Sequence, residues 1–391
     1  MIQTADEPVI RATRPGDAAS RRIRVLHVVQ NLNYGGMERL LADIVRGTDR
    51  SRFDVHVLCL EYFGRFAEGL DRHATLHLLG PQPRYSIVWP RTLIERIRAI
   101  QPDVVHSHSG VWFKTARAAR AAGVPLIVHT DHGRAEPDPW RCRFFDARAS
   151  RRTDVVVAVS EPLADYLRRK KIVARRTPIR VILNGVDTTR FRPRPDDGGL
   201  RTSLGLAPDT PIVGSIGRFE WDKGYDVVVE AFARLRASWH APGPAPVLVL
   251  AGEGSERPDL ERRIAYHGLD GAVHLLGWRD DAEALLPAFS VFTLASRIEG
   301  TSISLLEAMS TGIRPVVTAV GGNPDVVGEA LRHFLVPPDD PDALARAWAE
   351  VLADPERSRR EGEAARIRVE RHFSIQATVR AYERLYAGEA P

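Results

Sequence analysis

The sequence has few cysteines and no long apolar run, and these absences exclude several classes of protein. Cys59 and Cys142 are the only cysteines among 391 residues, so the chain has neither a disulfide framework nor a cysteine cluster for zinc. No stretch of 18 apolar residues occurs, so no segment is long enough for a membrane-spanning helix. The first 21 residues lack the apolar core of a signal peptide. We therefore expect a cytoplasmic protein with a disordered tail at 1–21.

The sequence also lacks the glycine fingerprints of common nucleotide-binding enzymes. The nearest approach to Gly-x-Gly-x-x-Gly is residues 252–257, which end in arginine, and the loop after the first expected strand offers only Gly35 and Gly36. Lys223 is followed by glycine and by no Ser or Thr, so it does not belong to a P-loop. These absences argue against a dinucleotide-dependent dehydrogenase and a P-loop NTPase.

Positive charge is concentrated in the first half of the chain. Residues 1–200 hold 34 Lys and Arg against 22 Asp and Glu, whereas residues 201–391 hold 21 against 28. We hypothesise contact with anionic lipid at the inner face of the membrane, and a solvated basic face is the alternative. No nucleic-acid-binding motif accompanies the charge, so we expect no nucleic acid partner. The residues behind the lipid hypothesis are 85–100, Arg141, Arg143, Arg148, Arg151, Arg152, 168–171, Arg175 and Arg176.

Short runs rich in Val, Ile and Leu recur at helix-length intervals. Near-continuous apolar runs of this kind predict parallel strands covered by helices on both faces. We therefore predict an α/β protein of two doubly wound, Rossmann-like domains facing across a cleft. The Gly- and Pro-containing segment 191–211 predicts a linker between domains at 22–190 and 212–372. The expected strands are 23–29, 53–60, 75–79, 103–106, 124–129, 154–159 and 179–183, then 212–216, 246–251, 272–276, 290–294, 315–319 and 333–336.

Two glutamates eight positions apart, Glu299 and Glu307, form the most informative pattern. A strand pattern precedes Glu299, and an apolar helix pattern carries Glu307. A glycosidase pair needs carboxyls about 5 to 10 Å apart, whereas eight helical residues rise about 12 Å. The spacing favours two acceptors for different hydroxyls of one long ligand, with an anion between them at the helix start. Taken alone, the pattern is also compatible with a surface acid and an ordinary helix glutamate.

A second motif, residues 217–226, follows one expected strand and leads into a helix pattern at 225–236. Arg218 offers a planar guanidinium suited to phosphate, and Lys223 offers a mobile point charge. Two solvated surface cations are the alternative. Together with the glutamate pattern, the motif predicts a site for a ligand that carries both phosphate and hydroxyl groups.

Four histidines end two neighbouring expected strands. His106 and His108 share one face of a strand, and His129 and His132 end the next. With Asp131 they could form the metal site of a hydrolase, which we keep as an alternative. For His106 we expect a structural role, and His132 alone is compatible with a satisfied polar residue at a strand end.

In these motifs the chain resembles the large family of retaining glycosyltransferases called group 1 or family 4, which has the GT-B fold. The resemblance covers about residues 22–375, and its strength lies in the number and order of the matching stretches. The further stretches that agree are 31–38, 159–161, 182–187, 252–254, 277–280 and 321–327.

The resemblance implies a role for individual residues. Arg218 and Lys223 hold the diphosphate of the donor. Glu299 binds hydroxyls of the transferred sugar, Glu307 binds the nucleotide ribose, and His132 lies near the sugar and the acceptor. Of these, His132, Glu299, Arg218 and Lys223 form the expected catalytic set. The other donor-binding residues are Gly35, Gly36, Gly300, Thr301, Ser302 and Ile303.

The resemblance further implies a metal-independent transferase without a cofactor. The co-substrate is a nucleoside-diphosphate sugar, the acceptor is a glycan or a lipid-linked hydroxyl, and the setting is polysaccharide or glycolipid biosynthesis. The C-terminal segment 373–391, with a helix pattern at 375–386, is expected to return to the first domain. A nucleotide-sugar epimerase, a phosphorylase and a non-catalytic sugar-nucleotide binder stay open as alternatives on the same architecture.

Overall fold

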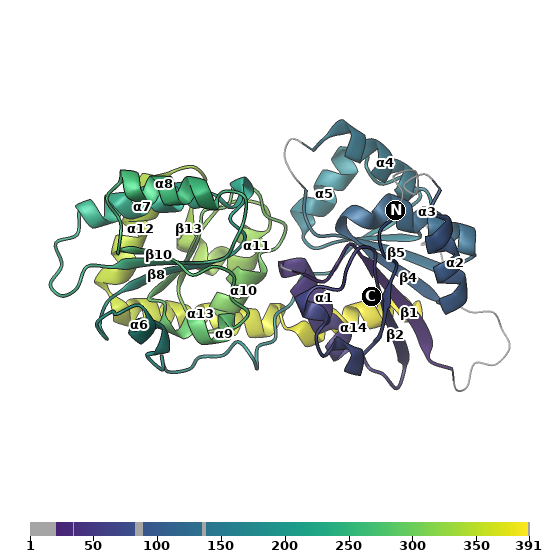
Figure 1. Ribbon diagram of the computed structural model, residues 1–391, viewed down its shortest axis with the longest axis horizontal. Coiled ribbons are helices and arrows are strands. Elements are labelled where there is room, and N and C mark those ends of the chain that lie inside the picture. The colour runs from purple at the N-terminus through teal and green to yellow at the C-terminus, as the bar shows by residue number, and fades with distance from the viewer. Residues whose placement is uncertain (1–20, 34, 83–88, 135–137, 390–391) are drawn as a thin grey trace, which may run out of the picture.

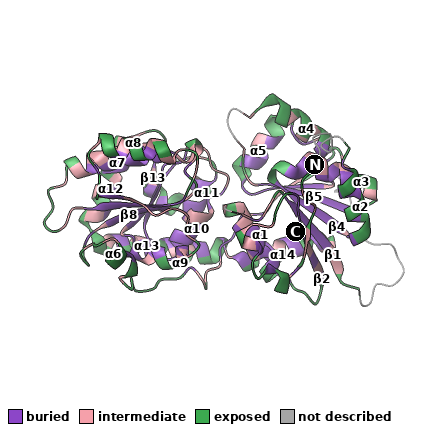
Figure 2. Cartoon of the chain, viewed as in Figure 1, coloured by how far each residue is buried: buried purple, intermediate pink, exposed green. Residues whose placement is uncertain are grey.

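The computed structural model of the protein describes residues 21–33, 35–82, 89–134 and 138–389. The tail expected at 1–21 lies outside the described residues except for Arg21, and residues 85–88 of the region 85–100 lie outside them too. Figure 1 shows two lobes side by side, each with a central sheet between layers of helices. Figure 2 shows that the strands are buried, whereas the helices expose their outer faces.

The first domain is built on a parallel sheet of seven strands in the order β3-β2-β1-β4-β5-β6-β7. Its strands carry runs such as Val104–His108 that are buried throughout, because helices cover both faces of the sheet. The strands are β1 (Ile23–Val29), β2 (Phe53–Cys59), β3 (Thr75–Leu78), β4 (Val104–His108), β5 (Leu126–Asp131), β6 (Val155–Ala158) and β7 (Ile179–Val181). The helices are α1 (Gly36–Gly47), α2 (Arg91–Ile100), α3 (Trp112–Ala122), α4 (Trp140–Ser150) and α5 (Glu161–Arg169).

The second domain repeats this plan with six parallel strands in the order β10-β9-β8-β11-β12-β13. The strands are β8 (Ile212–Ile216), β9 (Val247–Ala251), β10 (Val273–Leu275), β11 (Val291–Leu294), β12 (Pro315–Thr318) and β13 (Leu335–Val336). The helices are α6 (Gly199–Ser203), α7 (Tyr225–Ala237), α8 (Arg257–Tyr266), α9 (Ala282–Leu285), α10 (Ile303–Ser310), α11 (Asn323–Val327), α12 (Pro341–Ala353) and α13 (Pro355–His372).

The chain crosses between the domains twice. After the long connection into the second domain it returns at Phe373, whose carbonyl accepts a hydrogen bond from the Val186 N–H at 2.9 Å. Helix α14 (Ile375–Ala387) then packs on α1 and buries Tyr382 and Tyr386 in the core of the first domain. In Figure 1, α13 and α14 run in yellow one after the other through the lower half of the two lobes.

Both sheets reverse their strand order at a defined point, between β1 and β4 in the first domain and between β8 and β11 in the second. Ligands of open α/β sheets bind in the crevice at the carboxyl ends of such strands. The predicted fold class is confirmed: this is the GT-B architecture of two doubly wound domains. Within the described part of the chain, none of the helices is both long and apolar enough to span a bilayer.

Candidate active site

A cavity of about 760 Å³ lies between the two domains, where their strand-end loops meet. Such a volume is typical of the sites that take small molecules and cofactors. The sequence-predicted residues converge on it from four segments that are far apart along the chain. Those that line it are Gly35, Gly36, His132, Arg218, Lys223, Glu299, Gly300, Thr301, Ser302, Ile303 and Glu307.

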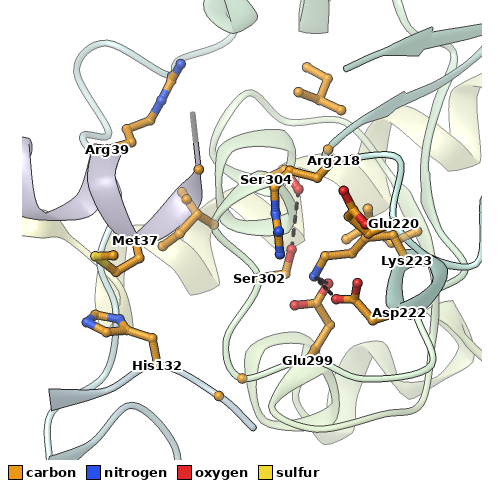
Figure 3. A pocket seen from close by; sticks show the side chains of 18 of the residues that line it. Met37, Arg39, His132, Arg218, Glu220, Asp222, Lys223, Glu299, Ser302 and Ser304 are labelled. Carbon is orange, nitrogen blue, oxygen red and sulfur yellow. Dashed lines mark hydrogen bonds and ion pairs between the residues drawn. The ribbon is translucent and has the colours of Figure 1, made fainter. Parts of the chain in front are cut away.

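On the side of the second domain, Lys223 and Glu299 lie together. Lys223 Nζ donates to Glu299 Oε1 at 2.9 Å, and the hydroxyl of Ser296 donates to the same oxygen at 2.8 Å. Asp222 stands 3.5 Å from the ammonium. Figure 3 shows this cluster beside Arg218, whose side chain extends along the wall toward Ser304. The loops after β8 and β11 therefore bring one lysine, one arginine and the carboxylates of Glu220, Asp222 and Glu299 to the same wall.

Helix α10 begins at this wall, and its first turn is open to the cavity. Ser302 caps the helix, with its side-chain oxygen accepting from the Leu305 N–H at 3.3 Å. In the described part of the chain, the N–H groups of Ile303 and Ser304 donate to no protein acceptor. Free N–H groups and the helix dipole favour an anion at this position, with Arg218 and Lys223 beside it.

Glu307, on the next turn of α10, contacts the first domain. Arg39 of α1 donates from Nη1 to Glu307 Oε1 at 3.2 Å, and both side chains are nearly buried. The guanidinium also lies over the rings of Phe66 and Phe191. Burial raises the pKa of the Glu307 carboxyl, and the charge of Arg39 acts in the opposite direction. Glu307, which the sequence predicted only as an acceptor for the ligand, thus also forms an ion pair between the two domains.

The first domain contributes the start of α1. A Cβ atom on Gly36 would lie 3.2 Å from Cγ1 of Ile303, so the missing side chain lets α1 approach α10 closely. Glu38, in the first turn of α1, lines the cavity, and burial raises its pKa while Arg218 lowers it. Glu38 and Arg218 therefore contribute opposite charges to the two sides of the cavity.

His132 follows β5 and lies below Met37 in Figure 3, across the cavity from Glu299. Its backbone carbonyl packs on Gly300, where a Cβ atom would come within 2.1 Å of the oxygen. Burial lowers the pKa of the His132 imidazole to about 4, so the ring is neutral at pH 7. Its Nδ1 is shielded from solvent and has no hydrogen-bond partner in the described part of the chain.

The four histidines weighed as a metal site do not converge. His129 stacks on Trp112 and pairs with Ser107, and Asp131 is held by Arg134 at 2.7 Å. The described residues do bring together His27, His106 and His108, with nitrogens within 4.8 Å of one another. Both His106 nitrogens are already hydrogen-bonded, to Tyr386 at 2.6 Å and to Thr130 at 2.7 Å. The alternative of a histidine metal centre in the cleft therefore finds no support in the geometry.

Comparisons with known families agree with the arrangement of the site. A model of the glycosyltransferase family 4 matches residues 34–190, and a model of the glycosyl transferases group 1 matches residues 199–368. The two matches follow one another and divide the chain as the two sheets do. The chain belongs to the group 1 glycosyltransferases. It is accordingly an enzyme of sugar transfer, as the motifs at 217–226 and 299–307 had indicated.

Several relatives of this glycosyltransferase have names that describe their reactions. An Escherichia coli UDP-Gal:alpha-D-GlcNAc-diphosphoundecaprenol alpha-1,3-galactosyltransferase is 28% identical over 85% of this chain and 89% of its own length. An alpha-maltose-1-phosphate synthase of Mycolicibacterium smegmatis is 30% identical over 73% of this chain and 79% of its own. The structure of Anabaena HepE in complex with UDP and glucose is 21% identical, with a TM-score of 0.81 over 94% of this chain and 100% of that one.

Sequence reasoning missed several residues of the glycosyltransferase cleft. Arg39 directly follows the stretch 31–38 that had been singled out, and nothing there indicated that it would reach Glu307. Glu38 was part of the same stretch and received no role. His27 was missed because the expected strand 23–29 ended in an ordinary apolar run, and only the strand order places it beside β4.

Proposed function

We propose that this glycosyltransferase moves a sugar from a nucleoside-diphosphate donor to an acceptor hydroxyl with retention of anomeric configuration. The observation that carries the proposal is the wall formed by Arg218, Lys223 and the free N–H groups that open α10. Two cations and a helix N-terminus on one wall suit a diphosphate. The E. coli relative uses a UDP-sugar according to its name, and the Anabaena structure holds UDP and glucose.

The donor would lie along this wall with its sugar toward Glu299. Lys223 and Glu299 are 2.9 Å apart, so a phosphate and a sugar hydroxyl bound side by side would each meet one of them. Glu307, which lies further along α10, would accept a hydrogen bond from a hydroxyl of the ribose. His132 on the opposite wall would contact the sugar and the incoming acceptor.

Catalysis in this arrangement rests on charge stabilisation of the leaving diphosphate. As the glycosidic bond breaks, negative charge grows on the phosphate oxygens, and Arg218, Lys223 and the start of α10 are already oriented toward it. Their charge acts where a metal ion acts in other transferases, so we propose that the reaction needs no divalent metal. The acceptor hydroxyl would attack from the face of the leaving group, with a phosphate oxygen taking its proton.

The donor is identified by a thermal-shift and hydrolysis screen over UDP-, GDP- and ADP-sugars, with and without a divalent metal. We expect one donor to raise the melting temperature without metal and to be hydrolysed slowly. Glu307→Gln should weaken this shift while keeping an oxygen for Arg39. The matched control is Glu329→Gln, because its side chain is 82% exposed and far from the cavity.

Two further variants test the catalytic roles. Lys223→Ala and Glu299→Ala should stay folded and lose turnover of the donor that the screen identifies. Near-native turnover in either variant would refute the assignment of the site. Stabilisation by a metal alone, with no effect of any donor, would contradict a metal-independent transferase.

We further propose that the acceptor is presented at an anionic membrane surface. Helix α4 follows directly on the loop that carries His132, and it exposes Trp140 by 66% and Phe144 by 46%. The guanidinium of Arg148 lies 4.2 Å from the centre of the Phe144 ring. Aromatic rings with adjacent arginines are typical of segments that bind the interface of an anionic bilayer.

Co-sedimentation with liposomes tests this surface. We expect binding to vesicles rich in phosphatidylglycerol at low salt, with weaker binding for Trp140→Ser/Phe144→Ser. Tyr266→Ser in the second domain is the control, because Tyr266 is 85% exposed and lies on α8. Equal binding of both variants, or no binding by the parent protein, would show that the acceptor is reached in another way.

A further inference from the structure

A row of three hydrogen-bonded imidazoles runs from the interior of the first sheet to the cleft. His27 Nδ1 lies 3.1 Å from His108 Nε2, and His108 Nδ1 lies 3.2 Å from His132 Nε2. The rings of His27 and His108 are stacked, with centroids 5.4 Å apart. The row exists because β1 and β4 are neighbours in the sheet and β5 follows β4.

The row restricts where protons can sit. A hydrogen bond between two imidazoles needs one nitrogen with a proton and one with a lone pair. If all three rings are neutral, only two arrangements satisfy both bonds. In the first arrangement, His27 donates to His108 and His108 donates to His132, and the proton of His132 is on its Nδ1. In the second arrangement, His132 donates to His108 and His108 donates to His27, and His132 Nδ1 is an acceptor.

Several observations indicate that the rings are neutral. His27 and His108 are 1% exposed, and burial lowers the pKa of both. In the part of the chain that the structure describes, the groups that face the row are the imidazoles of His106 and His129 and the hydroxyl of Tyr386, and none of these brings a negative charge. A proton on any ring of the row would therefore lack a compensating carboxylate.

We propose that His108 is a positioning residue for sugar transfer, which fixes the orientation of the His132 ring and couples its tautomer to those of His108 and His27. The inference rests on the proposed function in one respect, namely that His132 contacts the bound sugar or acceptor. With Nε2 held by His108, the remaining nitrogen of His132 is Nδ1, which is shielded from solvent and has no partner among the described residues. His108 itself reaches no ligand, since it is buried behind His132.

Two variants of nearly equal size separate positioning from packing. Asparagine places its amide near the position of Nδ1, and glutamine places its amide near the position of Nε2. His108→Asn therefore keeps a partner for His132, whereas His108→Gln keeps a partner for His27 and releases His132. His106→Asn is the matched control, because His106 is equally buried on the same strand and makes no hydrogen bond to His132.

The first measurement is nuclear magnetic resonance of the whole protein with ¹⁵N-labelled histidine, in which His132→Asn identifies the His132 signals. We expect the ¹⁵N signal of a hydrogen-bonded Nε2 of neutral His132 at pH 7 in the parent protein, in His108→Asn and in His106→Asn. In His108→Gln we expect His132 Nε2 to lose this hydrogen-bond shift. An Nε2 signal without a hydrogen bond in the parent protein, or identical His132 signals in all variants, would overturn the inference.

The second measurement is turnover of the donor. A ring that is misplaced by about 1 Å costs roughly 10- to 100-fold in rate. We expect kcat to fall by that factor in His108→Gln with the donor KM within twofold of the parent, and to stay within threefold in His108→Asn. If kcat and the melting temperature fall equally in both variants, His108 acts only through packing. If the parent protein turns over no donor, the proposed function fails. The resonance measurement then still tests whether His108 holds His132.

Discussion

Acidification from pH 7 to pH 5 should destabilise the first domain strongly. Burial lowers the pKa of His27 to about 3 and that of His132 to about 4. Between the ordinary value of about 6.5 and these values, the unfolded chain binds a proton at each site and the folded chain does not. The stability is therefore complete above about pH 6.5 and is lost progressively as the pH falls toward 4.

The size of the loss follows from proton linkage. Each such histidine contributes about 1.4 kcal/mol per pH unit, so two sites cost about 4 kcal/mol between pH 6.5 and pH 5. The pKa values of His106, His108 and His129 are also lowered by burial, and they add in the same direction. Buried carboxyls with raised pKa values oppose this loss at the acid end of the range. A loss of this size is a large part of the 5 to 15 kcal/mol that typically stabilises a folded protein.

The assay is urea unfolding at pH steps from 7.5 to 5.0, followed by tryptophan fluorescence. Trp112 reports on the first domain, because its ring stacks on His129 with centroids 4.0 Å apart. His27→Asn should reduce the slope of stability against pH by about 1.4 kcal/mol per unit. The exposed His240 provides the control variant, His240→Asn, because water surrounds its ring in both states. Stability that is constant from pH 7 to pH 5, or an unchanged slope in His27→Asn, would refute the reasoning.

Three further substitutions test contacts of the cleft. Lys223→Ala should lower kcat by about 10²- to 10³-fold, which single-turnover release of the nucleotide measures. Gly300→Ala would place a Cβ atom 2.1 Å from a first-domain carbonyl oxygen. It should therefore lower the free energy of unfolding by about 1 to 3 kcal/mol and raise the donor KM. The control is Gly110→Ala, whose Cβ would meet nothing within 4 Å, and it should change neither the melting temperature nor the kinetics. Arg39→Met leaves Glu307 buried without its partner and should cost about 3 to 5 kcal/mol in urea unfolding, and the added change Glu307→Leu should recover most of it.

The strands and the principal motifs could be predicted from the sequence because their signals are local. Apolar runs such as 212–216 and 246–251 mark buried parallel strands, and the structure places β8 and β9 there within a residue. The helix that carries Glu307 was recognisable from its apolar spacing, and Ser302 supplies the cap at its start. The residues predicted at the ends of these strands therefore line the cavity in the structure.

The contacts that join distant segments could not be predicted in the same way. Arg39 and Glu307 are 268 positions apart, and their pairing depends on the relative placement of two domains. The position of His27 beside His108 depends on strand order, which periodicity does not encode. The arginines of α4 were part of the lipid hypothesis, but its aromatic residues were not singled out, and only the structure shows that most of the helix surface faces water.

The returning helix α14 has a consequence for how the protein is made. Synthesis proceeds from the N-terminus, and domains of a growing chain usually fold in that order. Here the second sheet and its helices are complete when residue 372 has left the ribosome, whereas the first sheet still lacks Tyr382 and Tyr386. The hydroxyl of Tyr386 is also the partner of His106, so the interior beneath the cleft is completed only when the last turn of α14 packs on it. The domain that is translated first is therefore the one whose core is completed last.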